Sequence, residues 1–256
     1  YIINQRFLMI FKNISIKFLK FIKLLINKTT RRGLYYNIAA SIELEELIKN
    51  LNINMIIDIG SNKGQFILIL DKFFKNIKVL SFEPISEVLK KQKKFFASRE
   101  NITFFNFALG SSNSETILNI TRKKDSSSIL QIANENLLGR NFDIIEKRQI
   151  SVKTLESALR NIKLKDSILL KLDVQGYEFE VLKGAENLLP KIKYIITEVA
   201  KNQIYKNQVA ENIVIKYLKE RNFEIIKTAN LFKIKNTNYL QKDILFINKL
   251  LINDDK

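Results

Sequence analysis

Two glycines stand four residues apart behind an acid in the segment Asp58-Ile-Gly60-Ser-Asn-Lys-Gly64. Glycine adopts backbone conformations that other residues avoid, and it lets the main chain approach a ligand closely. The spacing differs from the Gly-x-Gly-x-x-Gly of dinucleotide folds, and Gly64 precedes Gln65 rather than the Lys-Ser/Thr of a phosphate loop. The pattern therefore disfavours a pyrophosphate cradle. The plainer alternative is a tight turn between a strand and a helix.

A second acid, Glu83, follows about twenty residues later and directly precedes Pro84. An acid at this place can accept two hydrogen bonds from the hydroxyls of a ribose. Pro84 favours a fixed turn at the same point. The alternative is a surface glutamate that caps the following helix.

Three further carboxylates are candidates for proton transfer: Asp173, Glu178 and Glu198. A lysine or a tyrosine is the alternative. The chain has no histidine and no cysteine, which excludes triad hydrolases, thiolate nucleophiles and the usual transition-metal sites, and no metal site is predicted. Asp173 is the first choice for the base. The alternative is that Asp173 binds a cofactor or caps a turn and takes no part in proton transfer. Glu178 could instead complement a helix N-terminus, and Glu198 could be the buried partner of a lysine.

Elements that could position these residues alternate along the chain between strand-like and helix-like stretches. The expected strands are residues 54–59, 78–82, 102–109, 114–121, 149–152, 167–174, 194–199, 223–228 and 243–248. The expected helices are residues 41–50, 64–74, 86–98, 154–161, 178–189 (stopped by Pro190) and 209–221. A polar insert, residues 122–148, is either part of an acceptor pocket or a solvated loop.

This alternation predicts an α/β fold with a mostly parallel, seven-stranded sheet and helices on both faces. In such sheets ligands bind beyond the carboxyl ends of the strands, near the point where the strand order reverses. Asp58, Glu83, Asp173 and Glu198 each stand at or beside such an end. They are therefore expected to lie near one another.

The glycine turn, Glu83 and three further segments together resemble the FkbM family of S-adenosylmethionine-dependent methyltransferases, which have a Rossmann-like fold. The resemblance covers roughly residues 50–200 and weakens up to about residue 248. Ser61 stands where the family often has alanine. The matching segments are MIIDIGSNKGQF at 55–66, SFEP at 81–84, ALG at 108–110, LKLDVQGYE at 170–178 and VLKGAE at 181–186.

The resemblance implies a role for each candidate residue. Gly60 and Gly64, with the backbone of Ser61 and Asn62, would approach the methionine part of the cofactor, and Asp58 would orient that turn. Glu83, beside Pro84, would bind the ribose hydroxyls. Phe107 and Ala108 would line the adenine site, and Asp173 would lie beside the sulfonium and the acceptor.

The chain carries a net charge of +17. This charge favours an anionic partner such as nucleic acid or lipid, or it reflects a coding bias towards lysine, asparagine and isoleucine. Residues 3–28 predict a basic amphipathic helix that ends at a break, Thr29–Gly33. That helix could lie on an anionic membrane surface or pack on the protein, alone or in a homo-oligomer. Lysines interrupt every apolar stretch before the ~20 residues that a transmembrane helix needs.

The sequence thus predicts an N-terminal helical segment, residues 1–40, and a methyltransferase domain, residues 41–256. The expected reaction is O-methylation of a hydroxyl on a glycan, glycolipid or secondary metabolite, in the cytoplasm or at the periphery of a membrane. An RNA-binding or RNA-methylating protein is the first alternative, and nucleic acid is the less expected partner because no base-pocket motif follows the strands. A membrane-surface protein with an inactive methyltransferase fold is the second. A nicotinamide dehydrogenase is the least expected alternative, because the glycine spacing differs from that of dinucleotide folds.

Overall fold

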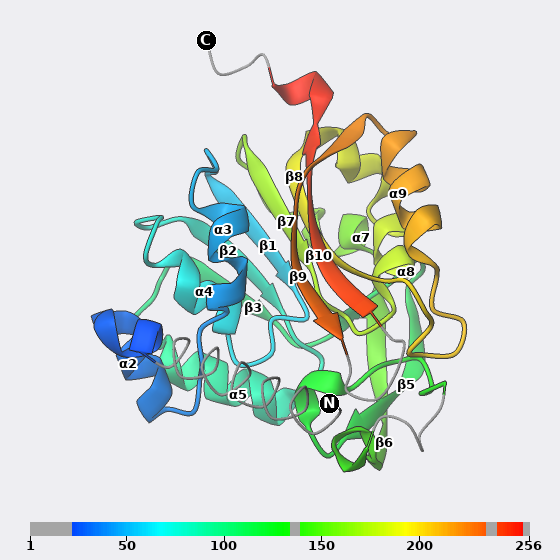
Figure 1. Cartoon of the computed structure of the whole chain (residues 1–256), viewed down its shortest axis with the longest axis horizontal. Coiled ribbons are helices and arrows are strands. Elements are labelled where there is room, and N and C mark those ends of the chain that lie inside the picture. Colours follow the sequence, from blue (N-terminus) through cyan, green and yellow to red (C-terminus); the bar gives the residue numbers. More distant parts are fainter. Residues whose placement is uncertain (1–21, 134–138, 234–239, 253–256) are drawn as a thin grey trace, which may run out of the picture.

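Seven strands form the main sheet of the computed structural model, which describes residues 22–133, 139–233 and 240–252. Their order is β3-β2-β1-β7-β8-β10-β9, so the chain reverses its direction of sheet growth between β1 and β7 (Figure 1). The strands are β1 (Met55–Ile59), β2 (Lys78–Phe82), β3 (Ile102–Phe105), β7 (Ile168–Leu172), β8 (Ile192–Ala200), β9 (Phe223–Lys233) and β10 (Leu240–Asn248).

The sheet is parallel from β3 to β8, and β10 runs antiparallel to both β8 and β9. Every residue of β1 and β7 is buried. A strand covered on both faces needs such a nearly continuous apolar run. The predicted seven-stranded, mostly parallel sheet is confirmed.

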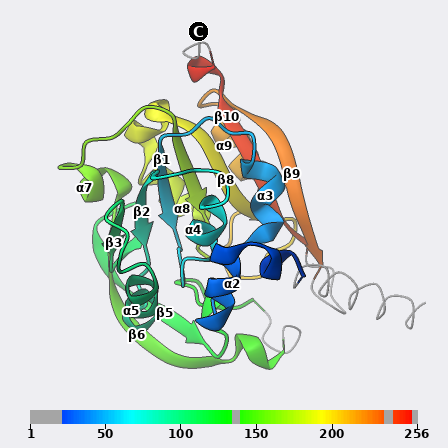
Figure 2. The same ribbon diagram turned by 90° about the vertical axis from the view of Figure 1, so that its left-hand side faces the viewer.

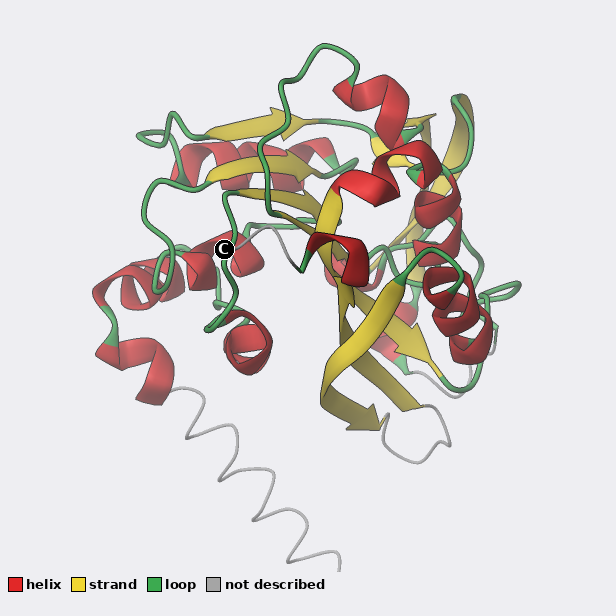
Figure 3. Cartoon of the chain, turned by 90° about the horizontal axis from the view of Figure 1, so that it is seen from above, coloured by secondary structure: helices red, strands yellow, loops and turns green. Residues whose placement is uncertain are grey.

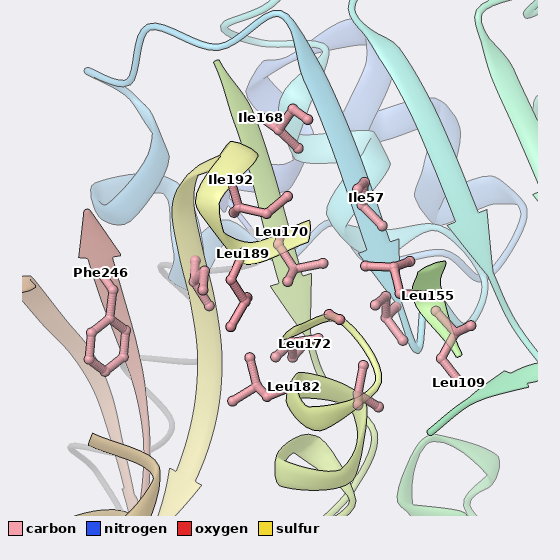
Figure 4. Packing of buried hydrophobic residues seen from close by; sticks show 14 of the residues in the cluster. Ile57, Leu109, Leu155, Ile168, Leu170, Leu172, Leu182, Leu189, Ile192 and Phe246 are labelled. Atoms are coloured by element: carbon pink, nitrogen blue, oxygen red, sulfur yellow. The ribbon is translucent and has the colours of Figure 1, made fainter. Parts of the chain in front are cut away.

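Helices cover both faces of the sheet, and two apolar clusters separate it from them (Figure 3). Side chains alternate between the clusters: Ile57 and Leu170 face one, and Ile56 and Leu169 face the other. Figure 4 shows the first cluster, and Figure 2 shows α2 and α3 on one side of β1 and α7 on the other. The helices are α2 (Lys28–Tyr35), α3 (Glu45–Ile48), α4 (Gln65–Leu70), α5 (Ser86–Phe95), α7 (Leu155–Leu159), α8 (Glu178–Lys183) and α9 (Glu211–Lys219).

A smaller sheet of three strands lies beyond the carboxyl end of β3, in the order β4-β6-β5. It consists of β4 (Ala108–Leu109), β5 (Ser114–Thr121) and β6 (Ile144–Lys153). The single expected strand 102–109 is therefore wrong. The Asn106 side chain donates hydrogen bonds to the carbonyls of Glu83 (2.9 Å) and Pro84 (3.0 Å), which holds a bend between β3 and β4.

The bounds of four other predicted elements need correction. The expected helix 178–189 ends at Lys183, because Gly184 lies against the backbone of Gly110, and Pro190 sits inside a separate 3₁₀ turn. β6 begins at Ile144, because its first half pairs with β5, so part of the expected insert is strand. The expected helices 41–50 and 64–74 are shorter, at 42–48 (partly 3₁₀) and 65–70.

The predicted break at Thr29–Gly33 is also wrong, because these residues form the body of α2. Asn27 caps that helix by accepting hydrogen bonds from the amides of Thr29 (2.8 Å) and Thr30 (3.4 Å). Leu24 packs in the second apolar cluster. Most of the expected helix 3–28 lies outside the described residues, and the division at residue 40 stays a prediction. Among the described residues, no helix is long and apolar enough to cross a membrane.

Candidate active site

The glycine turn after β1, residues 60–64, packs directly against the residues that follow β7. Gly60 has φ +74°, and a Cβ atom there would lie 1.9 Å from the carbonyl oxygen of Asp173. The amides of Gly60 and Ser61 both donate to the carbonyl of Phe82, at 3.1 and 3.0 Å. Only glycine meets both the conformation and the close approach. The turn is therefore fixed between β2 and β7.

Glu83 ties this turn to the end of β2. One oxygen accepts a hydrogen bond from the amide of Asn62 (3.0 Å), and the other accepts one from the amide of Ile85 (2.8 Å). Ile85 is also the N-cap residue of α5, so Glu83 contacts that helix end as well. Burial raises the pKa of Glu83 to about 7, although both amides favour its charged form.

Lys171 on β7 joins two of the predicted carboxylates. Its Nζ atom lies 3.4 Å from Oδ1 of Asp58 and 3.2 Å from Oδ2 of Asp173. Asp58 and Lys171 pair across β1 and β7 and both are buried. Burial raises the pKa of Asp58 and also opposes the charge on Lys171, but the carboxylates of Asp173 and Asp58 raise the pKa of Lys171 above its usual value. Each member of the pair therefore offsets part of the cost of burying the other.

Asp173 opens towards the insert between β5 and β6. Its side chain is 43% exposed, and Gln175 donates a hydrogen bond to its Oδ1 atom (2.8 Å). The side-chain oxygen of Gln175 accepts a hydrogen bond from the buried Tyr205 hydroxyl (2.9 Å). Its backbone carbonyl accepts a hydrogen bond from the Ser128 hydroxyl (2.7 Å). Asp173 is thus held between Lys171 and a polar network that fastens the insert.

Glu178 lies behind this strand end. Its Oε1 atom accepts hydrogen bonds from the amides of Val174 (3.0 Å) and Gly176 (3.2 Å). It is buried and does not line the cavity described below. Burial raises its pKa to about 7, against the effect of the amides.

This burial predicts how Glu178→Gln changes stability. A glutamate pKa raised from 4.5 to about 7 stabilises the fold fully only below about pH 4.5, and this contribution is lost as the pH rises through 7. We expect Glu178→Gln, whose amide oxygen can still accept both hydrogen bonds, to be more stable than the wild type by roughly 3 kcal/mol at pH 8. The two proteins should converge near pH 4.5. Urea unfolding at both pH values tests this, and a difference that does not depend on pH would contradict it.

Phenylalanines form the wall beside the end of β3. The rings of Phe82 and Phe105 stack at 4.4 Å, and Phe107 packs edge-on against Phe82 at 5.7 Å. Nζ of Lys153 lies 4.6 Å from the centre of the Phe107 ring. Phe107 and Ala108 meet Pro84 along one cavity, which gives an apolar wall suited to a flat ring.

One cavity of about 990 Å³ brings most of the predicted residues together. Its lining includes Gly60, Ser61, Asn62, Glu83, Pro84, Phe107, Ala108 and Asp173. Asp58, Gly64 and Glu178 do not line it and support it from behind. Gly64 is the N-cap residue of α4 and has φ +88°. It lies against the side chains of Phe96 and Gln92.

The insert also reaches the cavity, through Lys123 to Ile129, Asn141 and Phe142. Sequence reasoning missed Lys171, Gln175 and Gln241 in the lining. Lys171 had a signal, because a lysine in an apolar strand two residues before Asp173 shares its face. Gln241 had none, since its place depends on the pairing of β10 with β8.

Comparisons with known proteins agree with this architecture. A model of the methyltransferase FkbM domain matches residues 58–225, more than half of the chain. A solved FkbM methyltransferase from Methylobacillus flagellatus has a TM-score of 0.51 at 15% identity, over 83% of this chain and 50% of that one. This identity shows the fold alone, and the chain spans about half the length of that protein.

Two other solved structures are similar to the chain. A magnesium protoporphyrin IX methyltransferase from Synechocystis has a TM-score of 0.45 at 12% identity, over 91% of each chain. An rRNA methylase from Streptococcus thermophilus has a TM-score of 0.42 at 12% identity, over 77% of this chain and 88% of that one. No curated protein matches the chain significantly. The family match confirms the resemblance to the FkbM methyltransferases. The chain belongs to the FkbM family of methyltransferases.

Proposed function

We propose that the cavity binds S-adenosylmethionine and that the protein methylates a hydroxyl of a polar acceptor, such as a glycan, glycolipid or secondary metabolite. The observation that carries this proposal is the position of Asp173. Asp173 follows β7, and its backbone carbonyl lies against the Gly60 turn. Its carboxylate lines the same cavity as the serines of the insert and accepts a hydrogen bond from Gln175, whose backbone carbonyl binds Ser128. A ligand on the turn and an acceptor under the insert would therefore meet at this side chain.

The described residues fit such a cofactor. Each oxygen of Glu83 accepts one amide and keeps a further lone pair for a ribose hydroxyl. Oδ1 of Asn62 is buried without a hydrogen bond among the described residues, although it belongs to the turn that lines the cavity. Buried polar atoms of this kind are normally satisfied, so a ligand donor such as an ammonium group would complete the site. The cofactor supplies an activated methyl group, and the protein supplies its alignment with the acceptor.

The rim of the cavity favours an acceptor without a phosphate backbone. Lys123 pairs with Asp125 at 3.1 Å, and Lys124 forms an ion pair with Glu87. Arg148 binds the same glutamate at 2.7 Å. These cations are occupied by acids of the same chain, whereas nucleic-acid binding uses cations that are available for phosphates. The serines beside them, Ser126–Ser128, suit the hydroxyls of a sugar.

A labelled-methyl assay tests the acceptor class. The purified chain is incubated with S-adenosylmethionine that carries an isotopic methyl group, together with glycans, glycolipids or single-stranded RNA. We expect the label in a methyl ether that resists mild base, because an ether is stable where a methyl ester hydrolyses. Label found only in RNA or only in base-labile esters would contradict O-methylation of a hydroxyl.

We also propose that the N-terminal region contacts an anionic membrane. The first 42 residues contain eight cations and no acid. Within the described part, Ile26 is 75% exposed and Tyr35 is 86% exposed, next to Arg31 and Arg32. Basic and aromatic side chains together bind anionic lipid surfaces. Flotation with phosphatidylserine vesicles tests this, and equal flotation with neutral vesicles in moderate salt would contradict the electrostatic part.

A further inference from the structure

Ionisable residues form a row across four strands on one face of the sheet. Asp58 on β1 is opposite Lys171 on β7, and Glu198 on β8 is opposite Asp243 on β10. Asp173 follows Leu172, which is opposite Thr197, so it stands next to Glu198. Because side chains alternate along strands, all five continue the face that carries Ile56, Leu169, Ile196 and Leu245. Four carboxyl groups thus gather around Lys171 at the carboxyl end of the sheet.

Glu198 differs from the other carboxyl groups of this row. Asp58 is buried and does not line the cavity, and Asp173 binds Lys171 with one oxygen and Gln175 with the other. Glu198 lines the cavity and is half-buried, and the hydrogen bond recorded for its carboxylate comes from the amide group of Gln241 (3.0 Å). Glu198 therefore faces the cavity, and the hydrogen bond to its carboxylate comes from a neutral amide.

The surroundings of Glu198 favour its protonated form. Burial raises the pKa of Glu198 well above its usual value, and the neighbouring carboxylates raise it further, while Lys171 opposes them. The part of its side chain that is exposed lines the cavity, where water screens charge less than at an open surface. The ionisable groups that face it are Asp173 and Lys171 on β7, Glu178 on α8, Asp243 on β10 and the Tyr205 hydroxyl.

We propose that Glu198 is the base of this methyltransferase and that binding of the cationic cofactor deprotonates it. This inference rests on the proposed function. A sulfonium and an ammonium group brought beside the row add positive charge, which favours the ionised carboxylate. Glu198 then takes the proton of the acceptor hydroxyl while the hydroxyl oxygen forms its bond to the methyl carbon. The carbon–sulfur bond breaks with its electron pair on sulfur, and the proton on Glu198 leaves to water afterwards.

Proton release on binding tests this proposal without an acceptor. Calorimetric titration of S-adenosylmethionine at pH 7, in two buffers that differ in ionisation enthalpy, gives the number of protons released per cofactor bound. We expect the wild type to release protons when the cofactor binds. Glu198→Gln keeps the shape of the side chain and should release fewer protons than the wild type, with a dissociation constant within about threefold of the wild-type value, because Glu83 still titrates in both proteins. Glu224→Gln, an exposed glutamate of the same sheet, should behave as the wild type.

S-adenosylhomocysteine provides the matched ligand because it lacks the sulfonium charge. We expect it to release fewer protons from the wild type than S-adenosylmethionine does. Equal proton release from the wild type and Glu198→Gln would overturn the role of Glu198, and so would tight binding of the cofactor without proton release. Absence of cofactor binding in folded protein would instead overturn the proposed function, and this inference with it.

Discussion

Lys171→Met is expected to lower the free energy of unfolding at pH 7 by about 3–5 kcal/mol. The side chain of Lys171 is buried between Asp58 and Asp173, and no described residue donates a hydrogen bond to either oxygen of Asp58. Methionine fills a similar volume but leaves the Asp58 carboxylate buried without a counter-charge. Urea unfolding of the two proteins measures this difference.

A surface lysine provides the control for this substitution. Lys183 pairs with Glu180 on the exposed side of α8, so Lys183→Met should cost less than about 1 kcal/mol. The penalty for Lys171→Met should shrink at pH 5, because burial raises the pKa of Asp58 and lets it take a proton. Equal effects of the two substitutions, or a penalty independent of pH, would show that Lys171 does not hold a charged pair.

Gly60→Ala is expected to destabilise the fold by several kcal/mol and to abolish cofactor binding. Its φ of +74° is unfavourable for alanine, and the new Cβ would lie 1.9 Å from the carbonyl oxygen of Asp173. The turn must therefore move away from β7, which separates the parts of the cavity that Gly60 and Asp173 line. Thermal unfolding and calorimetry with S-adenosylmethionine measure both effects.

Gly139 separates backbone strain from the steric clash. It has a similar φ of +76°, but a Cβ there would meet nothing within 4 Å. Gly139→Ala should cost about 1–3 kcal/mol, less than Gly60→Ala, and should leave cofactor binding intact. If Gly60→Ala were no worse than Gly139→Ala, close contact between the turn and β7 would not be needed.

The central strands could be predicted from sequence because each is a nearly continuous apolar run that ends at a chemically distinctive residue. The runs before Asp58 and Asp173 are examples, and the two strands are neighbours at the reversal of strand order. The strand 102–109 also looked continuous, but it breaks where Asn106 binds carbonyls about twenty residues earlier in the chain. Such a contact leaves no local pattern in the sequence.

Site residues that directly follow a strand could be predicted from the sequence. Site residues that come together only because distant strands or segments pair in the fold were harder to predict. The part played by Lys171 depends on its pairing with Asp58 across two strands that lie far apart in the chain. Tyr205 reaches Gln175 from a segment beyond β8, which no spacing rule links to the end of β7. Glu178 was correctly placed next to the strand end, but its side chain turns back to the amides of Val174 and Gly176.

Cofactor binding at Glu83 is the most direct test of this account. Calorimetry should show micromolar binding of S-adenosylmethionine and S-adenosylhomocysteine to the wild type. Glu83→Ala should weaken that binding at least tenfold, a loss of about 1.4 kcal/mol. Glu87→Ala, which removes an acid in the first turn of α5 that does not line the cavity, should not change it. No binding to well-folded wild type, or equal losses in the two variants, would contradict a cofactor site built on the end of β2.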